Sequence, residues 1–272
     1  QGLIPALNLG LTQAKGTYIA RMDADDVSHP RRLEKQVVLL ERQPEVSVVG
    51  CLVRSFPRRS VREGFRIYER WLNQLTRHED IVRELFIESP LAHPSVVMRH
   101  SELKALGGYQ EHGWPEDYDL WLRYYLAGKR FAKVPEVLHF WREREGRLTR
   151  QDARYSVENF LRAKAYYLLA GPLQKRDAVI IWGAGQTGRR ISKHLQRGRA
   201  KLVAFVDVNP KKIGTLLRGL PVIAPDVLST RWGTYACPIL LSAVSSRGVR
   251  DRIREWMQHR GLKEGADFLC VA

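Results

Sequence analysis

The chain has 272 residues, of which 44% are hydrophobic, and this is enough for two domain-sized cores. Its 45 lysines and arginines outnumber its 29 aspartates and glutamates, so the formal net charge is +16 and we expect anionic partners, such as nucleotide sugars, phosphorylated lipids or an anionic membrane. Nucleic acid is not expected, because the arginines are dispersed and neither a ribonucleoprotein motif nor a zinc-finger spacing is present.

The first chemical motif is a group of carboxylates behind an apolar stretch. Residues 16–20 read as a buried strand, and Asp23, Asp25 and Asp26 follow it. Carboxylates at the end of a strand suit Mg²⁺ or Mn²⁺, which is often shared between one or two protein carboxylates and substrate phosphates. Aspartate is also common where strands end, and these residues can instead cap the next helix. From these residues alone, both interpretations stay open.

The surrounding sequence, residues 7–37, resembles the inverting, nucleotide-sugar-dependent glycosyltransferases of family 2. It has their order of features: a helix ending at Ala14-Lys15-Gly16, a strand followed by Asp-x-Asp, and a helix start over Pro30 to Gln36. The resemblance implies a GT-A fold, the fold of nucleotide-diphospho-sugar transferases. It also implies that Asp23 faces the donor nucleotide or sugar and that Asp25, with Asp23 beside it, holds Mg²⁺ or Mn²⁺ on the diphosphate.

The chain begins at Gln1, inside this family pattern. Family 2 enzymes open with two strands that hold the nucleoside base and ribose, and neither strand can be read here. We therefore expect an N-terminally truncated, partial GT-A domain over residues 1–150, with the metal and acceptor half present and the base-binding half upstream.

Packing patterns follow the acidic motif. Apolar periodicity predicts a helix over Arg31 to Gln43, stopped by Pro44, and a strand over Val46 to Val53. A second apolar stripe predicts one helix over Glu69 to Ile87, which Ser89-Pro90 ends.

The second chemical motif combines a β-rich run over His93 to Arg99, a Gly-Gly-Tyr turn at residues 107–109, and a helix start at Glu116. Family 2 enzymes show the same order, and the resemblance implies that Asp117 is the catalytic base. An inverting transfer needs a carboxylate that takes the acceptor proton. The alternative is structural, because acids in the first turn of a helix complement its dipole without any catalytic role.

The neighbours of Asp117 receive secondary roles. Glu116 is expected to orient the acceptor, and Trp114 to offer an apolar face to a sugar, although burial against the helix would also explain the tryptophan. Asp119 reads as a helix-surface acid, and His93 as a hydrogen-bonded wall residue rather than a proton shuttle.

The strand over Phe131 to Trp141 is expected to close this domain. Many relatives carry a Tyr-Arg-x-His near this point, whose histidine completes the metal or diphosphate site, and here Arg144 stands where that histidine is expected. A guanidinium neutralises phosphate but cannot coordinate a cation. Either another residue, with His139 a candidate, supplies the third ligand, or Arg142 and Arg144 replace part of the metal's role at the diphosphate. Both arginines can also be surface charges.

A second fold follows a helical linker over residues 151–176, in which one amphipathic helix is expected over Gln151 to Leu169. Residues 178–182 read as a buried strand, after which come a Gly-x-Gly-x-x-Gly, a helix over 189–196 and a strand over 202–206. This order predicts a Rossmann-like parallel-sheet domain over residues 177–272. The expected cofactor-binding residues are Gly183, Gly185, Gly188 and Asp207, the last placed to meet a ribose hydroxyl.

The stretch from Phe205 to Gly214 and the Gly219-Leu220-Pro221-Val222 that follows resemble the nucleotide-binding-like front domain of sugar acetyltransferases. Such a domain binds a nucleotide, a nucleotide sugar or NAD(P), or only packs against a neighbour. The ligand therefore stays open at this point.

The sequence thus predicts a metal-dependent inverting glycosyltransferase that acts on a nucleotide-sugar donor and a glycan or lipid-linked acceptor in polysaccharide or cell-envelope glycan synthesis. The alternatives are an NAD(P)-binding oxidoreductase, which lacks a convincing catalytic Tyr-Lys, Cys or His group, and a noncatalytic nucleotide-binding or scaffolding fragment. Three scattered cysteines, short apolar runs and no signal pattern predict a cytoplasmic protein. Peripheral contact with the anionic inner membrane face remains an open alternative.

Overall fold

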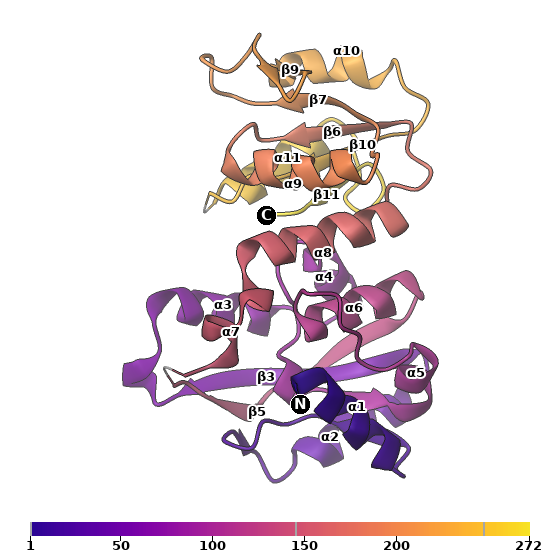
Figure 1. Ribbon diagram of the computed structural model, residues 1–272, viewed down its shortest axis with the longest axis vertical. Helices are drawn as coiled ribbons and strands as arrows, with labels where there is room; N and C mark the ends of the chain where they lie inside the picture. Colours follow the sequence, from indigo (N-terminus) through magenta and orange to yellow (C-terminus); the bar gives the residue numbers. More distant parts are fainter. Residues whose placement is uncertain (1, 145, 247) are drawn as a thin grey trace. The chain divides into compact units, whose positions relative to one another are not determined.

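The computed structural model describes residues 2–144, 146–246 and 248–272 (Figure 1). Two compact units can be distinguished. Unit 1 comprises Gln1–Leu85 and Ser89–Ser156, and unit 2 comprises Phe86–Glu88 and Val157–Ala272. Each unit has its own sheet, so the fold is mixed α/β, as the sequence predicts.

Unit 1 is built on a five-stranded mixed sheet in the order β1-β4-β3-β5-β2. The long strands β3 and β5 pair in parallel, whereas β1 with β4, β3 with β4, and β2 with β5 are antiparallel. The strands are β1 (Tyr18–Ala20), β2 (Val27–Ser28), β3 (Val46–Phe56), β4 (Val97–Arg99) and β5 (Arg130–Arg142). The α-helices are α1 (Leu3–Gln13), α2 (Arg32–Arg42), α3 (Glu63–Gln74), α4 (His78–Glu84), α5 (His100–Ala105), α6 (Glu116–Leu126) and α7 (Leu148–Gln151). Short 3₁₀ turns are η1 (Arg58–Ser60), η2 (His93–Ser95) and η3 (Ala153–Tyr155).

The stretch from Glu69 to Ile87 is not one helix, as expected, but forms the end of α3, a break and α4. The break occurs because backbone groups at the end of α3 pair with β5 instead of continuing the helix. The Thr76 carbonyl accepts the Lys133 N–H at 2.9 Å, and the Leu72 carbonyl accepts the Lys133 ammonium at 2.6 Å. Apolar periodicity cannot reveal this break, because both helices bury an apolar side chain, Leu72 in α3 and Ile81 in α4.

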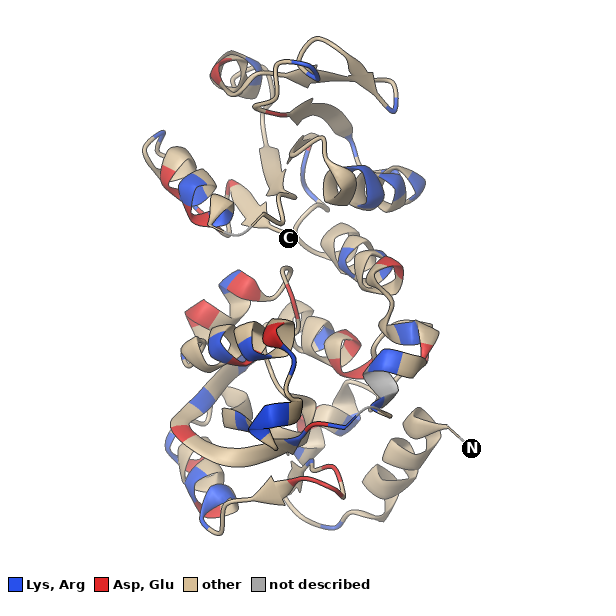
Figure 2. Cartoon of the chain, turned by 90° about the vertical axis from the view of Figure 1, so that its left-hand side faces the viewer, with Lys and Arg blue, Asp and Glu red and all other residues tan. Residues whose placement is uncertain are grey.

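Unit 2 has a six-stranded sheet in the order β11-β10-β6-β7-β9-β8, in which only the β8–β9 pair is antiparallel. The strands are β6 (Ala178–Trp182), β7 (Leu202–Val206), β8 (Leu216–Leu217), β9 (Leu220–Ile223), β10 (Pro238–Ser242) and β11 (Phe268–Cys270). The helices are α8 (Val157–Ala170), α9 (Gln186–Arg197), η4 (Pro225–Val227), α10 (Leu228–Trp232) and α11 (Val249–Gln258). Helices α9 and α11 lie on opposite faces of the sheet (Figures 1 and 2), and every residue of β6 and β10 is buried, as a parallel sheet covered on both faces requires.

The segment before unit 2 also differs from the expectation of one helix from Gln151 to Leu169. The Asp152 carboxylate accepts the Arg154 N–H at 2.9 Å and starts a 3₁₀ turn, and Ser156 then has extended backbone angles. Helix α8 begins only after this break, and the two compact units divide at the same point.

Candidate functional site

The three carboxylates of the acidic motif have different surroundings, and Asp26 is a buried structural residue. Its Oδ2 lies 2.8 Å from Nε2 of His139, and its Oδ1 accepts the Arg142 N–H at 2.7 Å. Asp26 is 8% exposed and His139 is fully buried. These bonds hold the loop after β1 against the end of β5.

The proton of His139 can be placed from its neighbours. Its Nδ1 lies 3.0 Å from Nη1 of Arg32, and a guanidinium can only donate, so Nδ1 accepts and Nε2 carries the proton that Asp26 accepts. Both ring nitrogens are therefore engaged, and no lone pair is left for a cation. The suggestion that His139 supplies a third metal ligand is wrong for this arrangement.

Asp23 and Asp25, in contrast, have side chains that are 40% and 31% exposed. Each is paired with an arginine: Asp23 with Arg21, and Asp25 through its Oδ2 with Nε of Arg144 at 3.1 Å. Arg142 donates from Nε to the Asp25 carbonyl at 2.5 Å. The two arginines expected at a diphosphate therefore lie directly beside Asp25.

This arrangement fits a cation of the Mg²⁺ type. Such a cation commonly takes only one or two protein carboxylates and completes its shell with water and substrate phosphates. Asp23 and Asp25 offer those carboxylates, and within the described residues no group of three or more His, Cys, Asp or Glu side chains forms a closed cage. A cation binding Asp25 would compete with Arg144 for the same oxygens.

Arg21 connects the first acidic motif with the second. Its backbone N–H donates to the Val96 carbonyl at 3.0 Å, which continues the pairing of β1 with β4. Burial, and secondly the charge of Arg21, keep the pKa of His93 well below its ordinary value, so His93 is neutral. Nε2 of His93 lies 2.8 Å from the hydroxyl of Tyr109.

Tyr109 lies among the charges of both motifs. Burial is the main cause that raises its pKa, and the charges of Arg21, Asp117 and Glu116 act on the same hydroxyl. The structure therefore brings the neighbourhood of Asp23 and the start of α6 together around one buried tyrosine, although these motifs are far apart in the sequence.

The two acids that begin α6 are placed differently. Glu116 is 2% exposed, and its Oε2 accepts the Tyr155 hydroxyl at 2.7 Å. Asp117 is partly exposed, and its Oδ1 accepts the N–H of Tyr118 at 2.7 Å. Burial, followed by the charges of Glu116 and Asp117, raises the pKa of Tyr155. Glu116 is thus bound within the protein, whereas Asp117 reaches the surface of the site.

Trp114 and Asp119 belong to the packing beneath the site. The indole N–H of Trp114, which is 7% exposed, donates to Oδ1 of Asp119 at 2.8 Å. Asp119 is fully buried and its Oδ2 lies 2.8 Å from Nε of Arg123, so the expectation of a helix-surface acid is wrong. Arg123 in turn donates to the Gly108 carbonyl at 2.7 Å. Trp114 is therefore buried against α6, which was the alternative to an exposed sugar-binding face.

The Gly-Gly-Tyr turn positions Tyr109. Gly108 has φ +66°, and a Cβ there would lie 2.8 Å from Oδ1 of Asn8. Asn8 holds both backbone groups of Tyr109, donating to its carbonyl at 2.8 Å and accepting its N–H at 2.9 Å. A larger residue at 108 would therefore displace the tyrosine that joins the two motifs.

Sequence reasoning gave no role to several residues that shape this site, namely Arg21, Arg32, Tyr109 and Tyr155. Tyr109 was visible as the last residue of the Gly-Gly-Tyr turn, and Arg21 as the cation directly before the acidic motif. Arg32 and Tyr155 carry no local signal, because their partners are distant in the chain.

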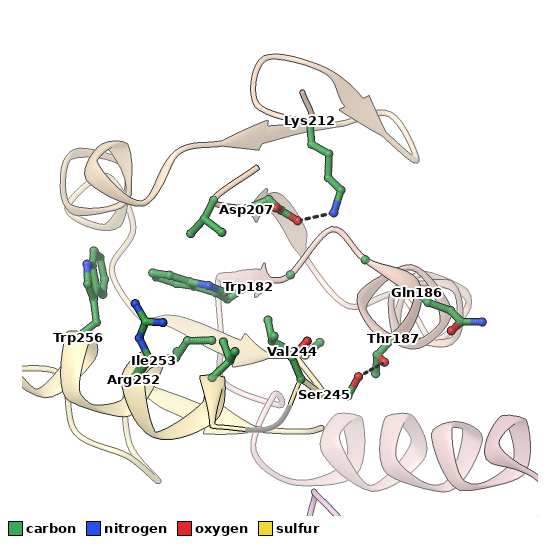
Figure 3. Close-up of a pocket in the computed structure, with 16 residues that line it drawn as sticks. Trp182, Gln186, Thr187, Asp207, Lys212, Val244, Ser245, Arg252, Ile253 and Trp256 are labelled. Atoms are coloured by element: carbon green, nitrogen blue, oxygen red, sulfur yellow. Dashed lines mark hydrogen bonds and ion pairs between the residues drawn. The ribbon is translucent and has the colours of Figure 1, made fainter. Parts of the chain in front are cut away.

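Unit 2 contains a cavity of about 520 Å³ at the carboxyl ends of β6, β7 and β10 (Figure 3). Its apolar wall includes Val244, Ile253 and the indoles of Trp182 and Trp256, whose ring centroids are 4.7 Å apart. Arg252 of α11 also lines the cavity. A cleft at this position of an open parallel sheet is where ligands usually bind.

The three expected glycines border this cavity or support it. Gly188 packs so closely that a Cβ would lie 1.8 Å from the Gly183 carbonyl oxygen. Gly183 has φ +112°, and a Cβ there would lie 2.9 Å from Val244. Gly185 lines the cavity and has nothing within 4 Å of its added Cβ. The first and third glycines are therefore required for packing, and the second leaves space for a ligand.

Asp207 already has three protein donors. Its Oδ2 accepts from the Ala184 N–H and from Nζ of Lys212, each at 2.9 Å, and its Oδ1 accepts the Asn209 N–H at 2.9 Å. Burial raises the pKa of Asp207, but these donors outweigh burial and hold the pKa below its ordinary value. A carboxylate has about four acceptor sites, so little capacity remains for the expected ribose hydroxyl.

Residues 1–106 match the family described as glycosyl transferase family 2. Unit 1 therefore contains a family 2 glycosyltransferase domain. The match includes Asp23 and Asp25, while Asp117, Arg142 and Arg144 lie beyond it. Residues 174–264 match the family described as CoA binding domain, which agrees with the Rossmann-like fold of unit 2.

Relatives of the family 2 domain are named as glycosyltransferases. The chain is 36% identical over 137 residues to the amylovoran biosynthesis glycosyltransferase AmsE of Erwinia amylovora, covering 50% of this chain and 49% of that protein. It is 37% identical over 160 residues to the putative glycosyltransferase EpsE of Bacillus subtilis, covering 58% and 54%. The chain thus spans about half the length of these relatives.

Among solved structures, the mannosyltransferase PcManGT of Pyrobaculum calidifontis, in complex with GDP-Man and Mn²⁺, is 17% identical and has a TM-score of 0.40, covering 74% of this chain and 49% of that one. This likeness is too small to support an inference. In the part of the chain that the structure describes, no helix combines the length and apolar character needed to cross a bilayer.

Proposed function

We propose that the family 2 domain transfers a sugar, with inversion, from a nucleotide-diphosphate donor to a glycan or lipid-linked acceptor in polysaccharide or cell-envelope glycan synthesis. The observation that carries the proposal is the convergence around Tyr109. Its hydroxyl lies 2.8 Å from Nε2 of His93, and Nδ1 of the same histidine lies 3.8 Å from Glu116. Arg21, whose charge acts on the same hydroxyl, is paired with Asp23. This convergence supports the proposal that a donor-side carboxylate and an acceptor-side carboxylate belong to one site.

On the donor side, Asp25 and Asp23 would hold Mg²⁺ or Mn²⁺, because their carboxylates are the exposed ones of the motif. When bound, the cation would stabilise the charge of the departing diphosphate. Arg142 and Arg144 lie beside Asp25 and would bind the diphosphate oxygens. Asp26 keeps the loop in place through His139.

On the acceptor side, Asp117 is the best-placed group to remove the hydroxyl proton. Glu116 is buried against Tyr155, and His93 is buried, neutral and bonded to Tyr109, so neither offers a free base to solvent. Asp117 is partly exposed at the start of α6. A carboxylate there needs only to reach the acceptor hydroxyl at hydrogen-bond distance.

The test is sugar transfer in the protein that carries these 272 residues, assayed with Mn²⁺ and a panel of nucleotide sugars. We expect Asp117→Asn to lower kcat by at least about 10²-fold, the usual contribution of a general base. Asp25→Asn should weaken the dependence on Mn²⁺. Asp80→Asn, which removes a carboxylate of α4 that is paired with the exposed Arg77, is the matched control and should leave transfer unchanged. Full activity of both site variants would refute the assignment.

The setting of the reaction is proposed to be cytoplasmic. Cys51, Cys237 and Cys270 are all free thiols, as is usual in a reducing compartment. Expression with a fused reporter that is active only in the cytoplasm would test this.

For unit 2 we propose binding of a nucleotide-containing ligand, such as NAD(P) or a CoA-type molecule, in the 520 Å³ cavity. Among the described residues, the titratable and cationic side chains that line it are Asp207, Lys212 and Arg252, and two of these are paired with each other. The cavity therefore suits binding better than proton transfer. Because Trp182 and Trp256 line it, titration with NAD(H) or CoA should quench tryptophan fluorescence, and no change at millimolar ligand would refute the proposal.

A further inference from the structure

The solvent side of α9 carries only positive charge. At about 100° per residue, Arg189, Arg190, Lys193 and Arg197 fall within an arc of about 100° on the helix. Three of them are exposed and Lys193 is half-buried. Figure 2 shows the resulting run of lysine and arginine along this helix. Arg199 and Lys201, also exposed, continue the positive charge beyond the helix end.

No acidic residue of the same segment offsets this charge, because the sequence contains neither Asp nor Glu between Asp177 and Asp207. Glu158 of α8 lies 2.9 Å from Nε2 of His194 and 4.0 Å from Nζ of Lys193. Within the described residues, the guanidinium groups of Arg189, Arg190 and Arg197 take part in no ion pair. This charge is therefore available to an external anion.

The hairpin of β8 and β9 is fixed to the same side of unit 2. Its turn residue Arg218 adopts φ +54° and donates from Nε and Nη2 to the Arg189 carbonyl at 3.2 and 3.1 Å. The Arg218 carbonyl accepts from the Gln196 amide at 3.4 Å. Leu216, at the start of the hairpin, is 72% exposed. An exposed leucine thus lies two residues from an arginine that is tied to α9.

We propose that this basic face is the surface through which the protein docks on an anionic lipid bilayer. The basic face comprises Arg189, Arg190, Lys193, Arg197, Arg199, Lys201 and Arg218, with Leu216 beside it. Clusters of four to eight Lys and Arg on one helix face are typical of binding to anionic lipid. The exposed leucine can enter the headgroup region, where apolar burial adds to the electrostatic attraction.

A bilayer fits this face better than a nucleic acid. Proteins that bind single strands add aromatic stacking platforms to their positive charge, and none of the residues of the basic face is aromatic. A phosphate backbone also offers nothing to Leu216. The proposal is independent of sugar transfer, so its failure would leave the function of unit 1 untouched.

The test is co-sedimentation of the 272-residue chain with vesicles of phosphatidylcholine alone or mixed with phosphatidylglycerol. We expect binding to the anionic vesicles only, weakened by added salt. Replacing Arg189, Arg190 and Arg197 together by glutamine should weaken binding by about 10²-fold, at about fivefold for each cation removed near the surface. Leu216→Ser should weaken binding several-fold. Because this contribution is apolar, the difference in affinity between the variant and the unchanged chain should persist when salt is added.

The matched control removes three exposed arginines of unit 1, namely Arg59, Arg62 and Arg70, which also become glutamine. This variant has the same net charge as the α9 variant and should bind vesicles nearly as well as the unchanged chain. Circular dichroism of all variants should be unchanged, since the replaced side chains are on the surface. Equal loss in both triple variants, no binding to anionic vesicles, or tighter binding to single-stranded nucleic acid than to vesicles would overturn the proposal.

Discussion

The pairing of Asp25 with Arg144 leads to a prediction with opposite effects on two ligands. The Arg144 side chain is 62% exposed and the Asp25 side chain is 31% exposed, so water reaches both partners and the pair resembles a surface ion pair. Exposed pairs contribute about 0.2–1 kcal/mol. A cation that binds Asp25 must displace the guanidinium, and Arg144→Gln removes this competition. Mn²⁺ should therefore bind the variant about 1.4- to 5-fold more tightly.

The same substitution should weaken the binding of diphosphate, because the displaced guanidinium is the group that we expect to bind the phosphate oxygens. Pyrophosphate in the presence of Mn²⁺ should bind the Arg144→Gln variant several-fold more weakly, since a charge-assisted bond is lost. Titration calorimetry of the 272-residue chain with Mn²⁺, and then with pyrophosphate at saturating Mn²⁺, separates the two effects.

Arg77→Gln is the matched control for this experiment, because Arg77 forms an exposed pair with Asp80 on α4. It should change neither affinity. If Arg144→Gln weakens Mn²⁺ binding, or if both affinities stay as they were, Arg144 does not compete for the cation and the reasoning from the ion pair is refuted.

Three further predictions concern stability. Burial lowers the pKa of Lys133 to about 7 and that of Lys164 to about 8, so between these values and about 10.5 the unfolded chain holds protons that the folded chain lacks. The free energy of unfolding should therefore rise with pH in this window by up to about 1.4 kcal/mol per pH unit for each lysine. Urea unfolding at pH 7 to 9.5 should show this slope, and the Lys133→Met and Lys164→Met variants should each lose their share of it. Gly188→Ala should destabilise unit 2 by about 3 kcal/mol or more, because the added Cβ would meet the Gly183 backbone. Gly185→Ala should keep the melting temperature of the unchanged chain and weaken only ligand binding. Equal melting temperatures of the two variants would contradict this. Asp26→Asn, which removes the charge from a fully buried bond, should cost about 2–3 kcal/mol in urea unfolding, and a loss below 0.5 kcal/mol or so would show that the bond is dispensable.

The Rossmann-like unit could be predicted from the sequence because its signals are local. The strand at residues 178–182, the glycine motif and the strand ending before Asp207 agree with the observed elements to within three residues. Helix α9 begins at Gln186, directly after the second glycine, as this motif usually requires. The expectation for Asp207 was less complete, since its three donors come from residues whose contacts depend on the folded loop.

The candidate site of unit 1 was only partly predictable. Adjacent aspartates look alike in the sequence, yet Asp26 is buried because a histidine 113 residues further along donates to it. The same limitation applied to Asp119, which reads as a surface acid until Trp114 and Arg123 are placed on either side of it. Long-range partners decide which of several identical carboxylates is buried, and no periodicity records them.

The hydrogen bond from Tyr155 to Glu116 has a consequence for how this domain can be separated from its neighbour. Tyr155 is contributed by η3, almost at the end of unit 1, and it holds the acid next to Asp117. A fragment that stops at residue 150 would keep both acidic motifs but lose this support. The smallest portable version of the domain, whether cut for expression or joined to another C-terminal partner, should therefore extend through Ser156.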